Sequence, residues 1–149
     1  QKGVLAGYPV VYLKADLYDG SYHPVDSSEM AFKIAASLAY KEGLMKANPV
    51  LLEPVANVKV YAPSDMIGDI MSAFTKRRGR VLGMTPTERK GEQMLEAEAP
   101  IAEMSDFAIQ LRAITQGRGS YTMKFERYED VPQMVADKII ADAKANAEE

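Results

Sequence analysis

The chain lacks cysteine, and histidine occurs only once in its 149 residues. Without cysteine there is no disulfide framework and no thiolate metal site, and this composition fits a reducing cytosol. A single histidine also excludes a zinc site built from several imidazoles. No apolar run approaches the roughly 18 to 20 residues that a membrane-spanning helix needs, and the first residues show no signal-peptide pattern. We therefore expect a cytoplasmic protein that neither holds a metal nor enters a membrane.

Catalytic motifs are missing as well. The sequence has no GxxxxGK(S/T) motif, so it cannot hold a nucleoside triphosphate as a P-loop does. The single histidine, His23, has no nucleophile and orienting group spaced around it. Glu96, Glu98 and Glu103 resemble paired carboxylates, but Glu96 and Glu98 fall on one face of a predicted strand, which favours a solvated strand face. We expect no catalytic residue and no cofactor in this chain.

Charge is unevenly distributed along the chain. The net charge of -3 at pH 7 argues against a general nucleic-acid binder. However, residues 56–128 carry eleven Lys and Arg against nine Asp and Glu, whereas residues 129–149 carry two against six. A locally basic centre beside an acidic tail is compatible with an RNA-facing patch. The hydrophobic fraction of 47% is enough for a folded core, and the length indicates one or two domains.

The first third of the chain reads as a strand, an exposed loop and a long helix. Rough alternation predicts a strand over Pro9–Leu17 and helical spacing predicts a helix over Asp26–Ala47. Asp26 can serve as the N-cap of this helix, with Glu29 three residues later as in a capping box. The predicted apolar stripe of the helix consists of Met30, Ala31, Ile34, Ala35, Leu38 and Met45.

The middle of the chain repeats a strand–helix–strand unit. The four strands are expected at 57–61, 81–84, 93–97 and 121–125. One helix is expected to begin with Pro63 at its first position, and the other to follow Pro100. Their predicted apolar faces are Ile67, Ile70, Met71 and Phe74 in the first, and Ile101, Met104, Ala108, Leu111 and Ile114 in the second. Two such units in tandem predict a ferredoxin-like βαββαβ domain, in which both helices cover one face of an antiparallel sheet.

The ends of this repeat define the expected domain boundaries. Glu53-Pro54 is the predicted boundary before the repeat. After it, Val131–Ala147 has the pattern of an amphipathic helix, with Val135, Ile139 and Ile140 facing inward. The sequence thus predicts an α+β chain with parts at 1–54, 55–128 and 129–149.

Two turns of the repeat carry arginine. Each follows a helix, and we expect both to lie at the same end of the sheet, where their arginines would form one patch with forked donors for phosphate. The alternative is a solvated helix end, favoured by the helix dipole, and a tight turn into a strand. The candidate RNA-contact residues are Lys76, Arg77, Arg78, Arg80, Gln116 and Arg118.

The loop before the long helix is the second candidate site. It is rich in hydrogen-bonding groups and its residues of interest are Ser21, Tyr22, His23, Pro24 and Asp26. A loop on a rigid strand–helix corner often carries function, and an imidazole there can bond to or stack on RNA. The alternative is a surface histidine without a task.

Five segments carry a resemblance to a known family. They are YDGSYHPVDSSEMAFKIA at 18–35, GVLAGYPVV at 3–11, ANPVLLEP at 47–54, RRGRVLGM at 77–84 and TQGRGSYTM at 115–123. Together and in order they resemble the C-terminal part of bacterial elongation factor G, the GTPase that drives translocation on the ribosome. The resemblance covers nearly the whole chain.

The resemblance implies a fold and a set of partners. Residues 1–54 would be the last portion of the fourth domain, part of a unit resembling the second domain of ribosomal protein S5. Residues 55–128 would be the ferredoxin-like fifth domain, and 129–149 a C-terminal helix and tail. The chain would be a fragment without catalysis, and GTP and Mg²⁺ would bind a missing N-terminal domain of the parent. The implied partners are the ribosome, with its RNA, tRNA and mRNA, and the rest of the parent chain; no oligomer is expected.

The resemblance also assigns roles to both candidate sites. In elongation factor G, the loop that corresponds to this one is the tip that enters the decoding site during translocation, and the fifth domain lies near the GTPase-associated ribosomal RNA; the resemblance implies the same roles here. Pro24, Ala62 and the pair Ser105-Asp106 depart from the usual pattern, which favours a divergent paralogue. Two alternatives remain: a ribosome-protection or translation-regulating GTPase relative, and a stand-alone ferredoxin-like binding module. The SYHPVDSSEMAFK tip argues against the former.

Overall fold

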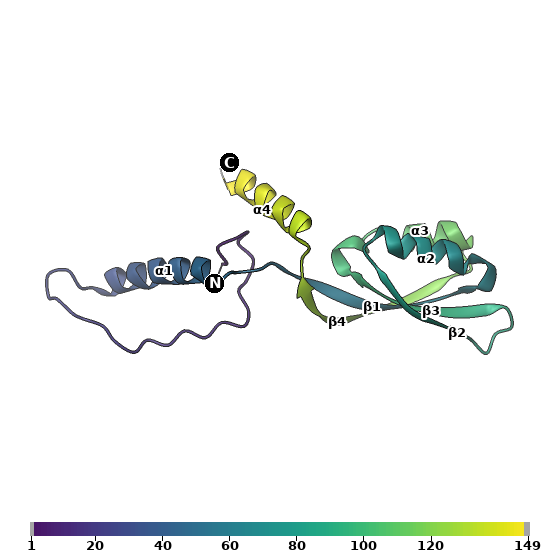
Figure 1. Ribbon diagram of the computed structural model, residues 1–149, viewed down its shortest axis with the longest axis horizontal. Helices are drawn as coiled ribbons and strands as arrows, with labels where there is room; N and C mark the ends of the chain where they lie inside the picture. The colour runs from purple at the N-terminus through teal and green to yellow at the C-terminus, as the bar shows by residue number, and fades with distance from the viewer. Residues whose placement is uncertain (1, 148–149) are drawn as a thin grey trace. The chain divides into compact units, whose positions relative to one another are not determined.

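The computed structural model describes residues 2–147, which form two compact units (Figure 1). One unit combines the chain up to Leu51 with the chain from Val131 onward, and the other is Leu52–Asp130. The predicted boundary pair Glu53-Pro54 lies inside the first strand of the second unit, because that strand begins at Leu52. Pro54 pairs there with the neighbouring strand on one side only, a place where a missing N–H is tolerated.

The second unit is an antiparallel sheet covered by two helices. Its strands are β1 (Leu52–Pro63), β2 (Arg80–Pro86), β3 (Glu92–Pro100) and β4 (Ser120–Asp130), in the order β2-β3-β1-β4. Its helices are α2 (Ile67–Lys76) and α3 (Phe107–Thr115), which lie on the same face of the sheet (Figure 1). This arrangement confirms the predicted α+β, ferredoxin-like βαββαβ topology.

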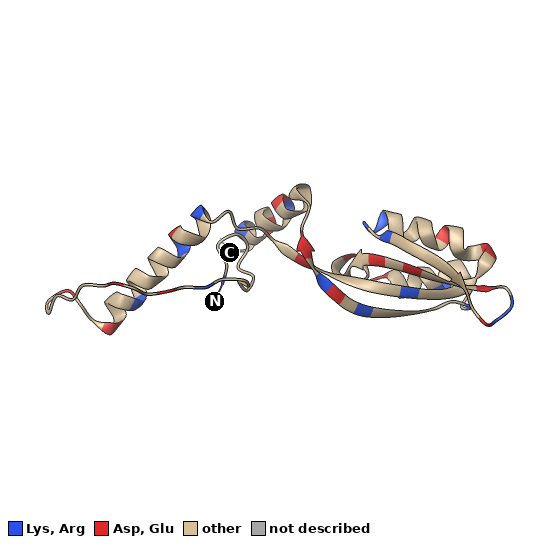
Figure 2. Cartoon of the chain, turned by 60° about the horizontal axis from the view of Figure 1, so that its bottom comes forward, with Lys and Arg blue, Asp and Glu red and all other residues tan. Residues whose placement is uncertain are grey.

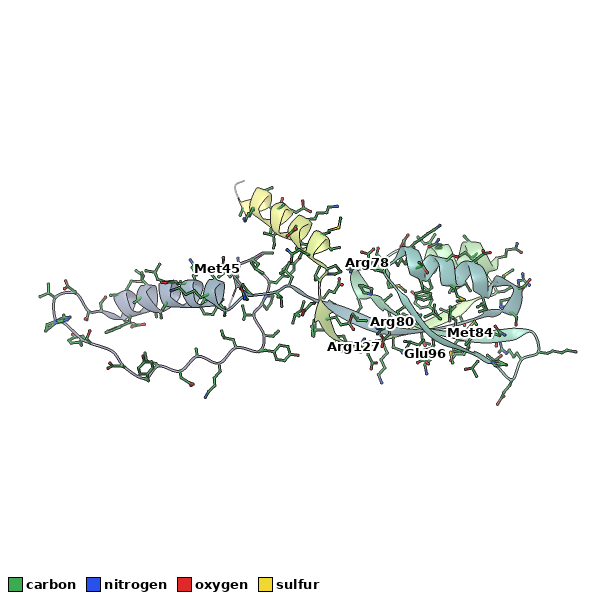
Figure 3. All side chains as sticks on the ribbon, viewed as in Figure 1. Met45, Arg78, Arg80, Met84, Glu96 and Arg127 are labelled. Carbon is green, nitrogen blue, oxygen red and sulfur yellow. The ribbon has the colours of Figure 1, made fainter. Side chains whose placement is uncertain are left out.

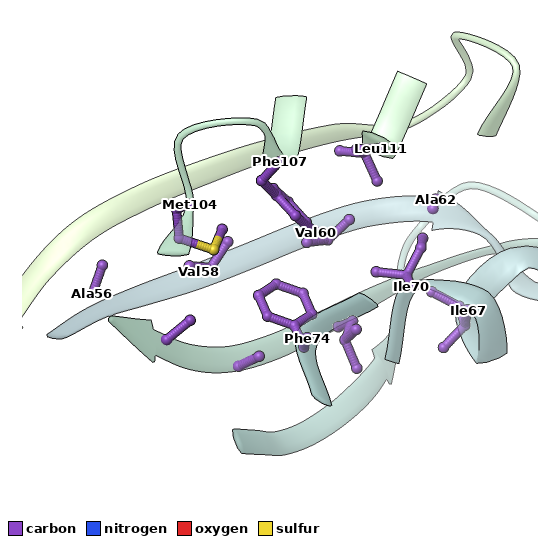
Figure 4. Packing of buried hydrophobic residues seen from close by; sticks show 13 residues of the cluster. Ala56, Val58, Val60, Ala62, Ile67, Ile70, Phe74, Met104, Phe107 and Leu111 are labelled. Carbon is purple, nitrogen blue, oxygen red and sulfur yellow. The ribbon is translucent and has the colours of Figure 1, made fainter. Parts of the chain in front are cut away.

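The core lies between the sheet and these helices (Figure 4). Alternate residues of β1, from Ala56 to Ala62, are fully buried, as the period of two in a strand requires. Phe74 of α2 and Phe107 of α3 meet above them, with ring centroids 4.9 Å apart. This core excludes water from the helix-facing side of the two central strands, β1 and β3, and burial of apolar surface there stabilises the unit.

Both helices of the second unit begin later than the sequence predicts. Pro63 and Pro100 have extended backbone and end their strands, and short 3-10 turns, η1 (Ser64–Met66) and η2 (Ile101–Glu103), follow. The expected first-position proline is therefore wrong. The break after η2 also resets the helical phase, so that Phe107 is buried in place of the predicted Ala108, which is exposed.

In the first unit, helix α1 (Glu29–Lys46) confirms the predicted long helix, but its N-cap is Ser28. The Ser28 hydroxyl accepts a hydrogen bond from the N–H of Ala31 at 3.1 Å. Asp26 instead belongs to the preceding turn, where its N–H donates to the carbonyl of His23 at 3.2 Å. The predicted cap at Asp26 is wrong because this turn holds it two residues before the helix begins.

The segment before the tip is not the predicted strand. Among the described residues, Pro9–Leu17 takes part in a single isolated bridge, between Lys2 and Pro9. A strand needs a partner for its backbone N–H and C=O groups, and alternation in the sequence supplies none. The predicted apolar stripe of α1 is likewise uncovered, with Met30, Ile34 and Leu38 each more than half exposed.

The last helix, α4 (Gln133–Ala147), follows Pro132 and begins two residues after the predicted start. Ala136 is buried, and Val135, Ile139 and Ile140 are half-buried, as the sequence pattern predicts. Within residues 2–147, no helix combines the length and the apolar character that crossing a membrane requires.

Candidate RNA-contact sites: the tip loop and the arginine turns

The backbone of the tip loop is fixed around His23. The N–H of His23 donates to the Ser27 hydroxyl at 2.8 Å, and the carbonyl of His23 accepts from the N–H of Ser27 at 2.9 Å. Its imidazole is exposed and makes no hydrogen bond to the described residues. A fixed backbone with a free side chain is suited to contact with an outside partner, because little loop entropy remains to be lost.

The other predicted tip residues surround this turn. Ser21, Pro24 and Asp26 are exposed. The ring of Tyr22 stacks on Phe32 of α1, with centroids 6.4 Å apart. The structure therefore brings the five predicted tip residues together in one exposed loop and connects that loop to the first turn of α1.

Arg77, at the end of α2, is a buried link between the helices. Its guanidinium donates to the carbonyl of Ala73 at 3.2 Å and to Asp106 at 2.8 Å. Its Cζ atom lies 5.8 Å from the centroid of the Phe107 ring, within reach of a cation–π contact. The hydrogen bond from Arg77 lowers the pKa of the Asp106 carboxyl. Arg77 is 8% exposed, so its position serves packing.

Arg78 joins three segments at one end of the sheet. Its two terminal nitrogens donate to both Glu53 oxygens, at 2.7 and 2.9 Å. Its Nε and Nη2 atoms also reach Glu103 of η2, each at 3.3 Å. The hydrogen bond with Glu53 is the largest cause of the raised pKa of Arg78. This guanidinium thus connects the start of β1, the end of α2 and η2.

Arg80 contacts Glu98 on the face of the sheet opposite the helices. Arg127 of β4 donates to the same carboxylate through both terminal nitrogens, at 2.8 and 2.9 Å. Both arginines are labelled in Figure 3. These bonds, first from Arg127 and then from Arg80, lower the pKa of Glu98 to about 2. Arg127 also contacts Glu129. Figure 2 shows the resulting neighbouring blue and red positions across the strands.

The prediction of a solvated acidic strand face is therefore wrong for Glu98, which is 8% exposed. Glu96, its neighbour on that face, is half-buried and accepts a hydrogen bond from Asn57 at 3.0 Å. Glu103 is the acceptor for Arg78. The three carboxylates serve as partners of cations and amides from other elements.

The second turn, Gln116–Ser120, differs from the first. Gln116 and Gly117 have φ angles of 52° and 80°, which place them in the left-handed region that ends a helix. Arg118 is exposed, and its Nη2 atom lies 3.7 Å from the sulfur of Met66. Lys76 of the first turn is also exposed. Neither cation has a carboxylate within 4.0 Å among the described residues.

The two turns lie at opposite ends of the sheet, so the predicted single patch is wrong. In the first turn, Arg78 contacts Glu53 at the start of β1. Ser120 pairs with Tyr61 near the end of β1. The reason is the direction of the strands. β2 is antiparallel to β3, and β3 is antiparallel to β1, so β2 runs parallel to β1. β4 pairs directly with β1 and runs antiparallel to it. The turn into β2 must therefore lie where β1 starts, and the turn into β4 where β1 ends.

Sequence reasoning missed Arg127 and the carboxylate partners Glu53, Glu98 and Asp106. The available signal was cross-strand register: once the βαββαβ order is adopted, Arg80 and Glu98 fall on adjacent strands of the same face. Opposite charges at facing positions of a sheet are stabilising pairs.

Two family models match consecutive parts of the chain. Residues 1–48 match the model of "Elongation factor G, domain IV", and residues 50–139 match that of "Elongation factor G C-terminus". The chain is thus part of a translational elongation factor. It belongs to the elongation factor G family, as the resemblance of its motifs predicts.

A solved structure supports this assignment. A crystal structure of a protein from Thermus thermophilus is similar to this chain with a TM-score of 0.81 and 46% sequence identity. The similarity covers 97% of this chain and 22% of that one. The chain therefore spans about a fifth of the length of the protein it matches.

Proposed function

We propose that this chain is the ribosome-binding C-terminal part of a translational GTPase that moves tRNA and mRNA through the ribosome. The chain itself supplies contacts and no catalysis. GTP and Mg²⁺ are handled by another domain of the parent protein, because this sequence has no phosphate-binding loop. The family membership and the order of the two matched domains support this proposal.

The observation that carries the proposal is the construction of the tip. Three hydrogen bonds between the backbone of His23 and the residues Asp26 and Ser27 close the turn, and the cap at Ser28 starts α1 directly behind it. The imidazole is left free, with Ser21 and Tyr22 preceding it. In the proposed role, this side chain contacts tRNA or mRNA at the decoding site by hydrogen bonding or stacking.

The test is a translocation assay with the parent protein carrying His23→Ala. We expect translocation to slow severalfold, whereas ribosome binding and GTP hydrolysis stay near wild type, because the tip acts after the factor has bound. Val25→Ala is the matched control, since Val25 lies in the same loop and is 94% exposed. Translocation at the wild-type rate by the His23→Ala protein would refute the role of the tip.

A further inference from the structure

The turn that presents His23 has a proline at its second position. Its first residue, His23, accepts a hydrogen bond from the N–H of its fourth residue, Asp26, at 3.2 Å, as in a β-turn. Proline fixes its φ at about -65°, which suits the second position of the common turns. Because Pro24 also restricts the unfolded chain, the sequence of the tip itself favours this turn.

Ser27 closes the same turn from the side of the helix. Its hydroxyl accepts from the N–H of His23 at 2.8 Å, and its own N–H donates to the carbonyl of His23 at 2.9 Å. Ser27 is half-buried, whereas every residue from 21 to 26 is exposed. One residue thus binds both backbone polar groups of His23, so that a large change in the backbone angles of His23 would leave one of them without its partner.

Phe32 holds the other side of His23 through Tyr22. The rings of Phe32 and Tyr22 stack with their centroids 6.4 Å apart and an angle of 21° between their planes. Phe32 does not belong to the predicted apolar stripe of α1, because its side chain lies roughly 130° around the helix from the centre of that stripe. A ring pair of this kind changes the ratio of held to released conformers by roughly two- to tenfold.

We propose that Ser27 and Phe32 are positioning residues for His23. Ser27 fixes the backbone of His23, and Phe32, through the ring of Tyr22, fixes the direction in which the loop leaves α1. The inference rests on the proposed role of the tip and names two residues that act through His23. An RNA partner then meets His23 in one orientation, and little conformational entropy is lost on contact.

The first measurement uses the 149-residue chain without ribosomes. Nitrogen-15 relaxation gives the order parameter of the His23 N–H in wild type, Ser27→Ala and Phe32→Ala. We expect about 0.85 in wild type, as in rigid backbone, and less than about 0.6 in both variants. The matched controls are Ser27→Thr, which keeps the hydroxyl, and Phe32→Tyr, which keeps the ring. Both controls should keep the wild-type value.

The N–H of Leu38, in the middle of α1, reports on the helix itself and should keep its order in every variant. An unchanged order parameter of His23 in Ser27→Ala or in Phe32→Ala overturns the positioning role of that residue. An equal loss of order at Leu38 also overturns it, because the substitution would then have loosened the whole helix.

The second measurement is a double-mutant cycle on translocation by the parent protein. Phe32→Ala alone should slow translocation by roughly two- to tenfold, with ribosome binding and GTP hydrolysis near wild type. Added to His23→Ala, it should cause no further slowing, because Phe32 acts through His23. If the two slowing factors multiply instead, Phe32 acts independently of His23, for example by stacking on RNA itself, and the inference is overturned.

The two measurements separate this inference from the proposed function. If His23→Ala alone translocates at the wild-type rate, the proposed role of the tip fails, and the order parameters still decide whether Ser27 and Phe32 hold His23. If His23→Ala slows translocation but the order of His23 is the same in wild type and in both alanine variants, the proposed role stands and the positioning inference fails.

Discussion

Substitution of Glu98 should destabilise the second unit, because this one carboxylate holds arginines from two strands. The pKa of Glu98 falls from its ordinary value of 4.5 to about 2, and the difference between these values corresponds to about 3 kcal/mol. The side chains of Arg80 and Arg127 are 65% and 39% exposed, so solvent screening reduces this amount. We expect Glu98→Gln to lower the free energy of unfolding by about 2 kcal/mol.

The stabilisation that Glu98 contributes should also depend on pH. Because the pKa of Glu98 is depressed in the folded state, its stabilisation is fully present above about pH 4.5 and is lost as the pH falls toward 2. We therefore expect urea unfolding from pH 7 to pH 2 to show that the difference in the free energy of unfolding between wild type and Glu98→Gln becomes smaller below pH 4.5.

The control for this prediction is Glu96→Gln, on the same face of β3. After this substitution an amide oxygen can still accept the hydrogen bond from Asn57, and the nearest cation to Glu96, Lys59, is 3.9 Å away. We expect a change of no more than about 0.5 kcal/mol. The reasoning is refuted if Glu98→Gln is as stable as Glu96→Gln at pH 7. It is also refuted if the difference in the free energy of unfolding between Glu98→Gln and wild type does not depend on pH.

Three further predictions concern the caps, the helix link and nucleotide binding. Ser28→Ala should destabilise α1 by about 1 kcal/mol, whereas Asp26→Ala should leave its helicity by circular dichroism unchanged; the reverse order would restore Asp26 as the cap. Arg77→Ala should lower the free energy of unfolding of the second unit by at least about 1 kcal/mol in urea, because Asp106 and the Ala73 carbonyl lose a charged donor; wild-type stability would contradict the link. The 149-residue chain should bind neither GTP nor GDP, and calorimetry showing stoichiometric micromolar binding would disprove this.

The sequence predicts the second unit well because its signals are local and repeated. Alternating residues such as Val58 and Val60 define the buried face of β1, and the stripe around Ile70 and Phe74 defines that of α2. Each of these patterns reports directly on which face is apolar. Together they suffice for the βαββαβ order.

What the sequence does not predict depends on partners distant along the chain. Whether an arginine such as Arg78 is available to RNA depends on Glu53, 25 residues away, and on Glu103. The cap at Ser28 depends on a turn closed by His23 and Ser27. Alternation over Pro9–Leu17 predicts a strand but cannot supply a pairing partner. Local pattern therefore identifies the candidate sites, and tertiary contacts decide which side chains remain free.

The location of the tip on the ribosome tests the central claim most directly. Because this chain has no cysteine, Val25→Cys places a single attachment site for an iron chelate next to His23; any cysteine elsewhere in the parent is replaced. With the parent bound to translocating ribosomes, hydroxyl radicals from this position should cleave small-subunit ribosomal RNA at the decoding site. Cleavage confined to other regions, from a protein that still binds the ribosome, would contradict the account.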